Sequence, residues 1–120
     1  MNLTKNFTSA EMSCKCCGAV FMDGEFMRAL QRLRDIVKFP LPINSGFRCE
    51  KHNKKIGGAK HSRHLVGCAA DISTKNMSIS QIKTLKEAIK LIDEFDGVAE
   101  GDGFVHVDSR PGDKNVTWTY

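Results

Sequence analysis

One stretch of sequence decides how the chain is organised: Ser62-Arg63-His64-Leu65-Val66-Gly67-Cys68-Ala69-Ala70-Asp71. It places an imidazole, His64, and a carboxylate, Asp71, seven positions apart, and both groups bind zinc well at about 2.0–2.2 Å. Because this spacing is too long for one helical turn, we expect His64 on a loop and Asp71 on the strand that follows. Gly67 permits the backbone turn that brings them together. On spacing alone, a surface histidine and a locally paired aspartate remain the simpler interpretation.

A second segment, GFVHVDSR at residues 103–110, supplies a third ligand. Its β-branched and aromatic content and its leading glycine predict a strand. With a period of two, His106 and Asp108 share one face while Val105 and Val107 share the other. Two histidines and one aspartate leave a fourth tetrahedral position for water, as catalytic zinc requires. We therefore predict a zinc site of His64, Asp71 and His106. For Asp108, a solvated polar strand face is the alternative interpretation.

Two amphipathic stretches, Asp23–Lys38 and Met77–Phe95, predict the long helices. Asp23 suits an amino-terminal cap, and Ser78 with Gln81 makes a capping box. The apolar residues at helical spacing are expected in the core. In the first helix they are Phe26, Leu30, Leu33, Ile36 and Val37.

Short strands are expected between and after these helices, at 41–44, 69–72, 98–99, 104–108 and 116–119. The strands are few and their connections irregular, which disfavours a doubly wound parallel sheet. We therefore expect an α+β fold: a small, mainly antiparallel sheet that carries the metal site, with the two helices packed against it.

The chain resembles the zinc D-Ala-D-Ala carboxypeptidase and L-Ala-D-Glu endopeptidase family, most closely its short phage and prophage endolysins. The resemblance extends from about Phe7 to Arg110. It implies the core fold shared with lysostaphin-type peptidases and the hedgehog signalling domain. The motifs that carry it are Ser45-Gly46-Phe47-Arg48, Asn53, Gly57-Gly58-Ala59, Ser62-x-His64-x-x-Gly67-x-Ala69-x-Asp71 and His106-Val107-Asp108.

The resemblance also implies roles for residues that do not bind the metal. Arg48 matches the family arginine that contacts substrate or polarises the scissile carbonyl, and its planar guanidinium suits a carboxylate or an oxyanion. A surface arginine packed along the fold is the alternative. Ser62 is expected to contact the substrate. His61 matches no ligand position, so we place it on a loop at the mouth of the cleft.

The general base is not at its usual place. Several relatives carry a glutamate three residues before the last ligand or a histidine two residues before it, where this chain has Gly103 and Phe104. Asp108 is the first candidate for the general base, and it could equally orient a metal ligand through a hydrogen bond. Glu100 and Asp102 are the alternatives.

The cysteines allow two interpretations. Cys14, Cys16 and Cys17 contain a Cys-x-x-Cys pair, which is half of a structural zinc site if Cys49 and a further Cys or His complete it. Reduced, partly buried thiols are the alternative, as expected in a cytoplasmic product. Five cysteines cannot all pair within one chain, which argues against a full disulfide framework. Cys68 is expected to be a small buried side chain.

Length and composition bound the remaining possibilities. The 120 residues suit one domain, so we expect a single zinc peptidase domain over residues 1–120. A composition of 41% hydrophobic and 27% charged residues argues against disorder. No apolar run approaches the roughly 20 residues that span a membrane, so we expect no membrane insertion. The net charge of +4 favours polyanions, but no aromatic-interleaved basic motif accompanies it, and we expect no nucleic-acid partner.

Residues 1–6 lack the apolar core of a secretory signal, so we expect a protein that is made in the cytoplasm without a signal peptide. We expect it to be a monomer and to act on the cell wall after its release. The predicted function is a zinc-dependent peptidase that hydrolyses peptidoglycan stem peptides, of the D-Ala-D-Ala carboxypeptidase or L-Ala-D-Glu endopeptidase type. The alternative is a catalytically weak, zinc-stabilised binding or structural domain of a phage particle.

Overall fold

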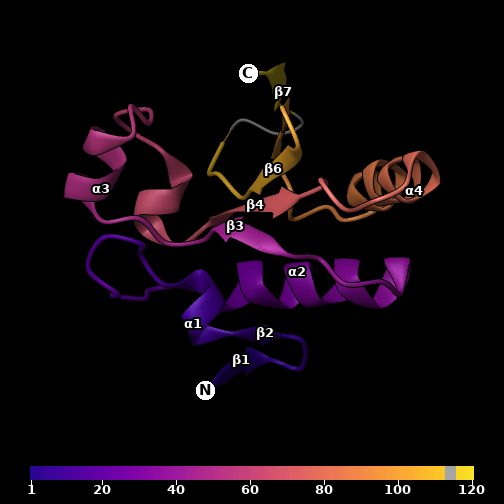
Figure 1. The fold of residues 1–120 in the computed structure, drawn as a ribbon, viewed down its shortest axis with the longest axis horizontal. Helices are drawn as coiled ribbons and strands as arrows, with labels where there is room; N and C mark the ends of the chain where they lie inside the picture. Colours follow the sequence, from indigo (N-terminus) through magenta and orange to yellow (C-terminus); the bar gives the residue numbers. More distant parts are fainter. Residues whose placement is uncertain (113–115) are drawn as a thin grey trace.

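A five-stranded sheet forms the centre of the computed structural model, which describes residues 1–112 and 116–120 (Figure 1). Every neighbouring pair of strands is antiparallel except the last, in which β7 runs parallel to β5. This arrangement confirms the expected α+β fold with a mainly antiparallel sheet. Across the sheet the order is β3 (Ile43–Ser45), β4 (Ala69–Ser73), β6 (Phe104–Asp108), β5 (Gly97–Gly101) and β7 (Val116–Thr119).

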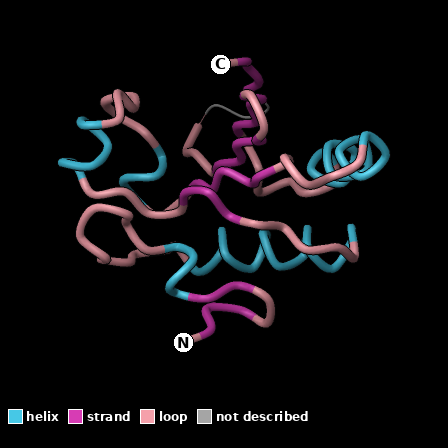
Figure 2. The backbone as a smooth tube through the Cα atoms, viewed as in Figure 1, coloured by secondary structure: helices cyan, strands magenta, loops and turns pink. Residues whose placement is uncertain are grey.

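The remaining elements are short, apart from two helices. A two-stranded sheet of β1 and β2 precedes the first helical turn, and a 3₁₀ helix, η1, precedes β4. Figure 2 shows the central strands lying between α4 on one side and α3 with the loop that follows it on the other. The bounds are β1 (Asn2–Thr4), β2 (Phe7–Thr8), α1 (Ser9–Met12), α2 (Gly24–Val37), α3 (Glu50–Lys55), η1 (Arg63–Val66) and α4 (Ile79–Lys90).

Both long helices begin as the sequence predicts. The Asp23 carboxylate accepts a hydrogen bond from the Phe26 N–H at 3.0 Å, and Ser78 and Gln81 form the capping box of α4. The predicted end of α4 is wrong, because the helix stops at Lys90 and not at Phe95. Hydrogen bonds of the tighter i→i+3 type continue the chain beyond it and keep Phe95 buried.

One face of the sheet and the two long helices share the hydrophobic core. Val105 and Val107 are buried there, as the strand periodicity predicts. Ile36 is not, since it is 45% exposed. Successive helical residues are about 100° apart, and it is Val37 that points into the core. Among the described residues no helix is both long enough and apolar enough to cross a membrane.

Gly67 closes η1 and starts the turn into β4. Its φ is +72°, a left-handed conformation that favours glycine, as the sequence predicts for this turn. A Cβ here would lie 2.2 Å from the Phe21 carbonyl oxygen, and the Gly67 carbonyl accepts a hydrogen bond from the Asp23 N–H at 2.9 Å. The turn that separates His64 from Asp71 is therefore fixed by both conformation and close packing.

We predict that Gly67→Ala lowers the free energy of unfolding by more than about 2 kcal/mol, because it adds a backbone clash to left-handed strain. Gly57→Ala is the matched control: its φ is +75°, but none of the described residues has an atom within 4 Å of the added Cβ, so the loss should be about 1 kcal/mol. Urea unfolding in the presence of a chelator measures both. Equal losses of unfolding free energy in the two variants would show that the contact with Phe21 does not contribute to the effect.

Candidate metal and active site

The register of two strands brings Asp71 and His106 together. Asp71 on β4 lies directly opposite His106 on β6, and cross-strand neighbours on one face have their Cβ atoms about 4.5–5.5 Å apart. His64 reaches the same place from η1, where the Ser62 hydroxyl accepts a hydrogen bond from the His64 N–H at 3.2 Å. One ligand atom from each of His64, Asp71 and His106 lies within 4.8 Å of the others. The three residues are 1%, 7% and 4% exposed.

Asp71 is the centre of this group. Its Oδ1 lies 3.3 Å from His64 Nε2 and 2.9 Å from His106 Nδ1, while its Oδ2 accepts a hydrogen bond from Arg48 Nη2 at 3.1 Å. Burial raises the pKa of Asp71, but the hydrogen bonds with His106 and His64 outweigh burial and hold that pKa well below its usual range. Asp71 is therefore an anion at neutral pH.

Each imidazole is oriented by a partner on its other side. His64 Nδ1 lies 2.6 Å from the Gly46 carbonyl oxygen, so this nitrogen donates and Nε2 is left facing Asp71. His106 Nε2 lies 2.7 Å from Asp108 Oδ2, which leaves Nδ1 facing Asp71. Such outer hydrogen bonds fix the tautomer of metal-ligating histidines.

His106 lies between two carboxylates. Burial lowers the pKa of His106, but hydrogen bonds with Asp108 and Asp71 outweigh burial and raise it above its usual value. Two imidazole nitrogens and a carboxylate oxygen that converge in one buried place need a proton or a cation between them. The donor set of two nitrogens and one oxygen is the set that fits zinc.

Asp108 is completely buried behind His106. Its Oδ2 accepts from His106 and from Arg110 Nη2 at 2.7 Å, and its Oδ1 accepts from Arg110 Nε at 2.9 Å. Burial raises the pKa of Asp108, but His106 and Arg110 outweigh burial and lower it to about 2. Gly97 makes the space, since a Cβ there would lie 2.3 Å from Asp108 Oδ1. This geometry favours an orienting role over that of a general base.

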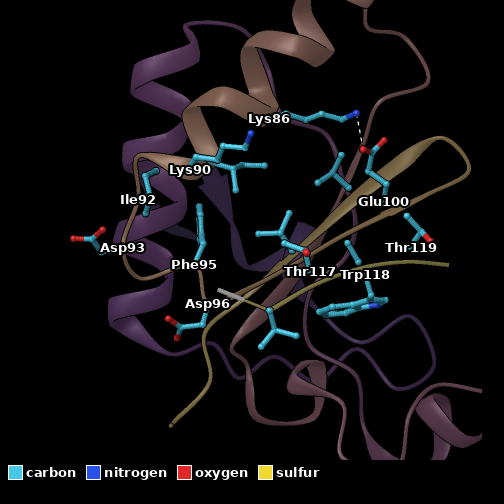
Figure 3. Close-up of a pocket in the computed structure, with 15 residues that line it drawn as sticks. Lys86, Lys90, Ile92, Asp93, Phe95, Asp96, Glu100, Thr117, Trp118 and Thr119 are labelled. Atoms are coloured by element: carbon cyan, nitrogen blue, oxygen red, sulfur yellow. Dashed lines mark ion pairs between the residues drawn. The ribbon is translucent and has the colours of Figure 1, made fainter. Parts of the chain in front are cut away.

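The other two carboxylates considered for the base lie away from this group. Glu100 is paired in register with Val105 and so lies on the opposite face of the sheet, where Lys86 Nζ is 2.6 Å from its Oε1. Figure 3 shows the pair in a groove of about 850 Å³ lined by α4, β5 and β7. Asp102 is exposed in the turn between β5 and β6 and lines no part of the metal pocket. The strand alternation that turns Ala99 toward His106 turns Glu100 away.

A pocket of about 710 Å³ opens over the three ligands. Arg48 lies in it, with Nε donating to Ser45 Oγ at 3.1 Å and Nη1 to Asn53 Oδ1 at 3.2 Å. Ser62 also lines it, so the structure brings Arg48 and Ser62 together in one pocket. His61 lines the pocket from an exposed loop, as the sequence predicts.

The sequence gives no prediction for three further lining residues. Arg110 forms the fork on Asp108, and its guanidinium carbon lies 5.2 Å from the centre of the Trp118 ring. Trp118 and Tyr120 flank His106, with ring centroids 5.3 and 6.4 Å away. Their period of two along the last strand signals a shared face, but only the pairing of β7 with β5 places that face beside the metal ligands.

Comparisons with known proteins agree with this geometry. A family model described as Peptidase M15 matches residues 5–108, which include the three candidate ligands and Asp108 but neither Trp118 nor Tyr120. The zinc D-Ala-D-Ala carboxypeptidase of Streptomyces albus G is 32% identical over 80 residues, or 56% of this chain. The match spans only 31% of the length of that protein.

We predict that Asp108 contributes to an acid-induced loss of stability in the metal-free protein. Its pKa is lower in the folded chain, about 2 against 3.8, so the stability it contributes is complete above pH 3.8 and is lost as pH falls through about 2. Between pH 5 and 2 the wild type should lose roughly 2 kcal/mol more than Asp108→Asn. Urea unfolding across this range measures the difference.

Asp93→Asn is the control for this experiment, because Asp93 is exposed. It should follow the wild type at every pH. An Asp108→Asn curve parallel to the wild-type curve would contradict the placement of this carboxylate between His106 and Arg110.

Proposed function

The chain belongs to the peptidase M15 family, and we propose that it is a zinc-dependent peptidase that hydrolyses peptidoglycan stem peptides. The observation that carries the proposal is the buried convergence of His64, Asp71 and His106 beneath an open pocket. A relative named as a zinc D-Ala-D-Ala carboxypeptidase supports the same chemistry. In this proposal the protein is a phage endolysin that acts as a monomer on the cell wall after release.

We assign His64, Asp71 and His106 as the protein ligands of the zinc ion. Three protein ligands are the number typical of catalytic rather than structural zinc, because one position stays open. When bound, zinc supplies a Lewis acid that polarises a peptide carbonyl and acidifies water. The chain itself contributes the anionic charge of Asp71 and the fixed tautomers of both histidines.

Arg48 and Ser62 are proposed to bind the substrate as well as to support the ligands. Arg48 holds the second oxygen of Asp71, and its guanidinium has further N–H groups for a substrate carbonyl. The Ser62 oxygen accepts the His64 N–H, and a hydroxyl in this role can still donate its O–H to a substrate. Lys60 and Arg63 line the same pocket, and their positive charge suits the carboxylates of a stem peptide.

Asp108 is proposed as a positioning residue. It orients His106 through Nε2, and Arg110 keeps it charged and fixed. It is completely buried, and His106 and Arg110 already donate to its oxygens, so water has no open approach to it. Proton transfer would then fall to His61, the pocket-lining imidazole that is not a ligand.

The alternative function is a catalytically weak, zinc-stabilised binding or structural domain of a phage particle. One observation favours it: of the three carboxylates considered for the base, Asp108 is fully engaged, and Glu100 and Asp102 lie away from the ligands. Such a domain would bind zinc and stem peptides without cleaving them, so turnover and not metal content separates the two functions.

The wild type with zinc should release soluble peptides or amino acids from purified sacculi, and a chelator should abolish the release. His64→Ala and His106→Ala should each lose one zinc per chain and all activity, because each removes one ligand. His61→Ala, the control for the loss of an imidazole, should keep its zinc. Mass spectrometry of the products and metal analysis of the proteins give the two readouts.

Full zinc content in both ligand variants would refute the metal assignment. Normal zinc content in a wild type that binds sacculi but releases nothing would establish the alternative function.

Asp108→Asn should weaken zinc affinity by roughly 10–100-fold, with activity restored by excess zinc, because the orientation of His106 is lost. If Asp108 were the base, turnover would instead fall by roughly 10²–10⁴ with zinc affinity unchanged. Competition with a chromogenic chelator measures affinity. Asp102→Asn, in the exposed turn, is the control and should change neither quantity.

A further inference from the structure

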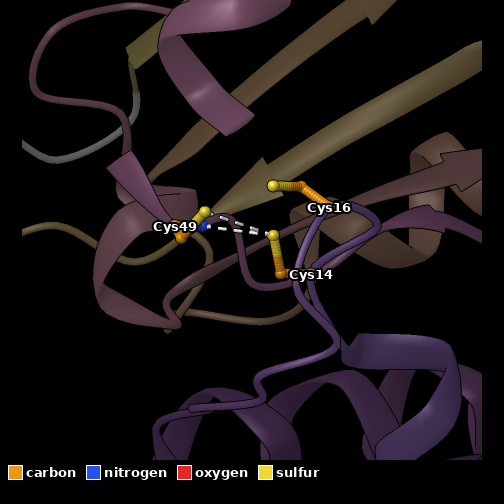
Figure 4. A group of neighbouring side chains, drawn as sticks. All are labelled: Cys14, Cys16 and Cys49. Atoms are coloured by element: carbon orange, nitrogen blue, oxygen red, sulfur yellow. Dashed lines mark hydrogen bonds between the residues drawn. The ribbon is translucent and has the colours of Figure 1, made fainter. Parts of the chain in front are cut away.

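Four of the five cysteines gather away from the metal pocket. Cys14, Cys16 and Cys17 lie in the loop after α1, and Cys49 immediately precedes α3. Figure 4 shows the side chains of Cys14, Cys16 and Cys49 close to one another. The sulfurs of Cys14, Cys16 and Cys49 lie within 4.8 Å of one another, and those of Cys14 and Cys49 are 3.6 Å apart. The fold thus brings together thiols that are separated by 35 positions in the sequence.

Backbone N–H groups point at these sulfurs. The Cys49 N–H donates to Cys14 Sγ at 3.5 Å. The His52 N–H donates to Cys49 Sγ at 3.4 Å. Cys14 is only 2% exposed. N–H groups directed at a sulfur stabilise the thiolate, which is the form that binds a metal.

Cys17 is a candidate fourth ligand, because it directly follows Cys16 in the same turn, next to the group of Cys14, Cys16 and Cys49. One disulfide would join two of these thiols and leave the other two unexplained, and all five cysteines of the chain are free thiols in this structure. Four thiolates around one point are the ligand set of a closed, structural zinc site.

We propose that Cys14, Cys16, Cys17 and Cys49 hold a second zinc ion with a structural role. This proposal does not depend on the proposed function. The site would fasten the loop at residues 13–23 to the residue that follows Arg48, and Arg48 holds Asp71. The same loop also contacts the chain next to residues of the site: Phe21 packs edge-on against Phe47, with ring centroids 6.4 Å apart, and the Asp23 N–H donates to the Gly67 carbonyl.

Metal analysis of purified variants tests the proposal. The wild type should contain about two zinc ions per chain, and Cys14→Ser and Cys49→Ser should each contain about one. Cys68→Ser is the matched control and should retain both, because Cys68 lies outside the group of Cys14, Cys16 and Cys49. His64→Ala should lose the zinc at His64, Asp71 and His106 and keep the zinc at the cysteines. Failure of one site is therefore distinguishable from failure of the other.

Cobalt substitution gives a second readout. Thiolate-bound cobalt has a sulfur-to-metal charge-transfer absorption that histidine and carboxylate ligands do not give. The band should persist in His64→Ala and disappear in Cys14→Ser. A wild-type zinc content that is unchanged in both Cys14→Ser and Cys49→Ser, or a band that survives in them, would overturn the proposal.

The unmodified chain provides a test if the serine variants do not fold. With zinc bound, Cys14, Cys16, Cys17 and Cys49 should resist alkylation, and chelator should expose them, while Cys68 reacts at one rate in both conditions. Mass spectrometry locates the modified residues. Equal alkylation with and without zinc, or protection through a disulfide in the chelated protein, would refute the site.

Discussion

The pairing of β4 with β6 is the constraint on which the candidate site depends. It sets Asp71 against His106 and Ala69 against Asp108, and it places all four on the face opposite the core. If β6 slipped by one residue against β4, its side chains would change faces. Its charged residues would then point into the core, and its valines would point away from it. The valines of β6 and the apolar residues of β4 therefore hold the register, and the register holds the metal ligands.

Buried charge is the second organising feature. Asp71 and Asp108 are both removed from water, and each is stabilised by an arginine on one side and an imidazole on the other. Burying a charge without such partners costs far more than a hydrogen bond returns. The two arginines also close the arrangement from opposite ends: Arg48 comes from the segment after β3, and Arg110 from the segment after β6. The ligands are thus oriented before any metal binds.

Local patterns in the sequence, together with the family resemblance, were sufficient to predict the starts of both long helices and the convergence of His64, Asp71 and His106. The period of two in residues 104–108 gave the correct faces of β6, and the caps at Asp23 and Ser78 gave the starts of both helices. Contacts between distant segments were not predictable. No local pattern shows that the Ile36 side chain stays largely exposed, or that Glu100 lies on the face opposite the metal ligands. The parallel pairing of Val116–Thr119, which brings Trp118 to the pocket, is equally remote from any local signal.

The last strand, β7, affects how readily the sheet can pair with a strand of another chain. β5 would be the edge of the sheet without β7, and its unpaired N–H and C=O groups would be available to a strand of another chain. β7 occupies those groups and is itself short, with two of its four residues exposed. By adding a parallel strand at this edge, the fold both completes the aromatic wall of the pocket and discourages edge-to-edge aggregation.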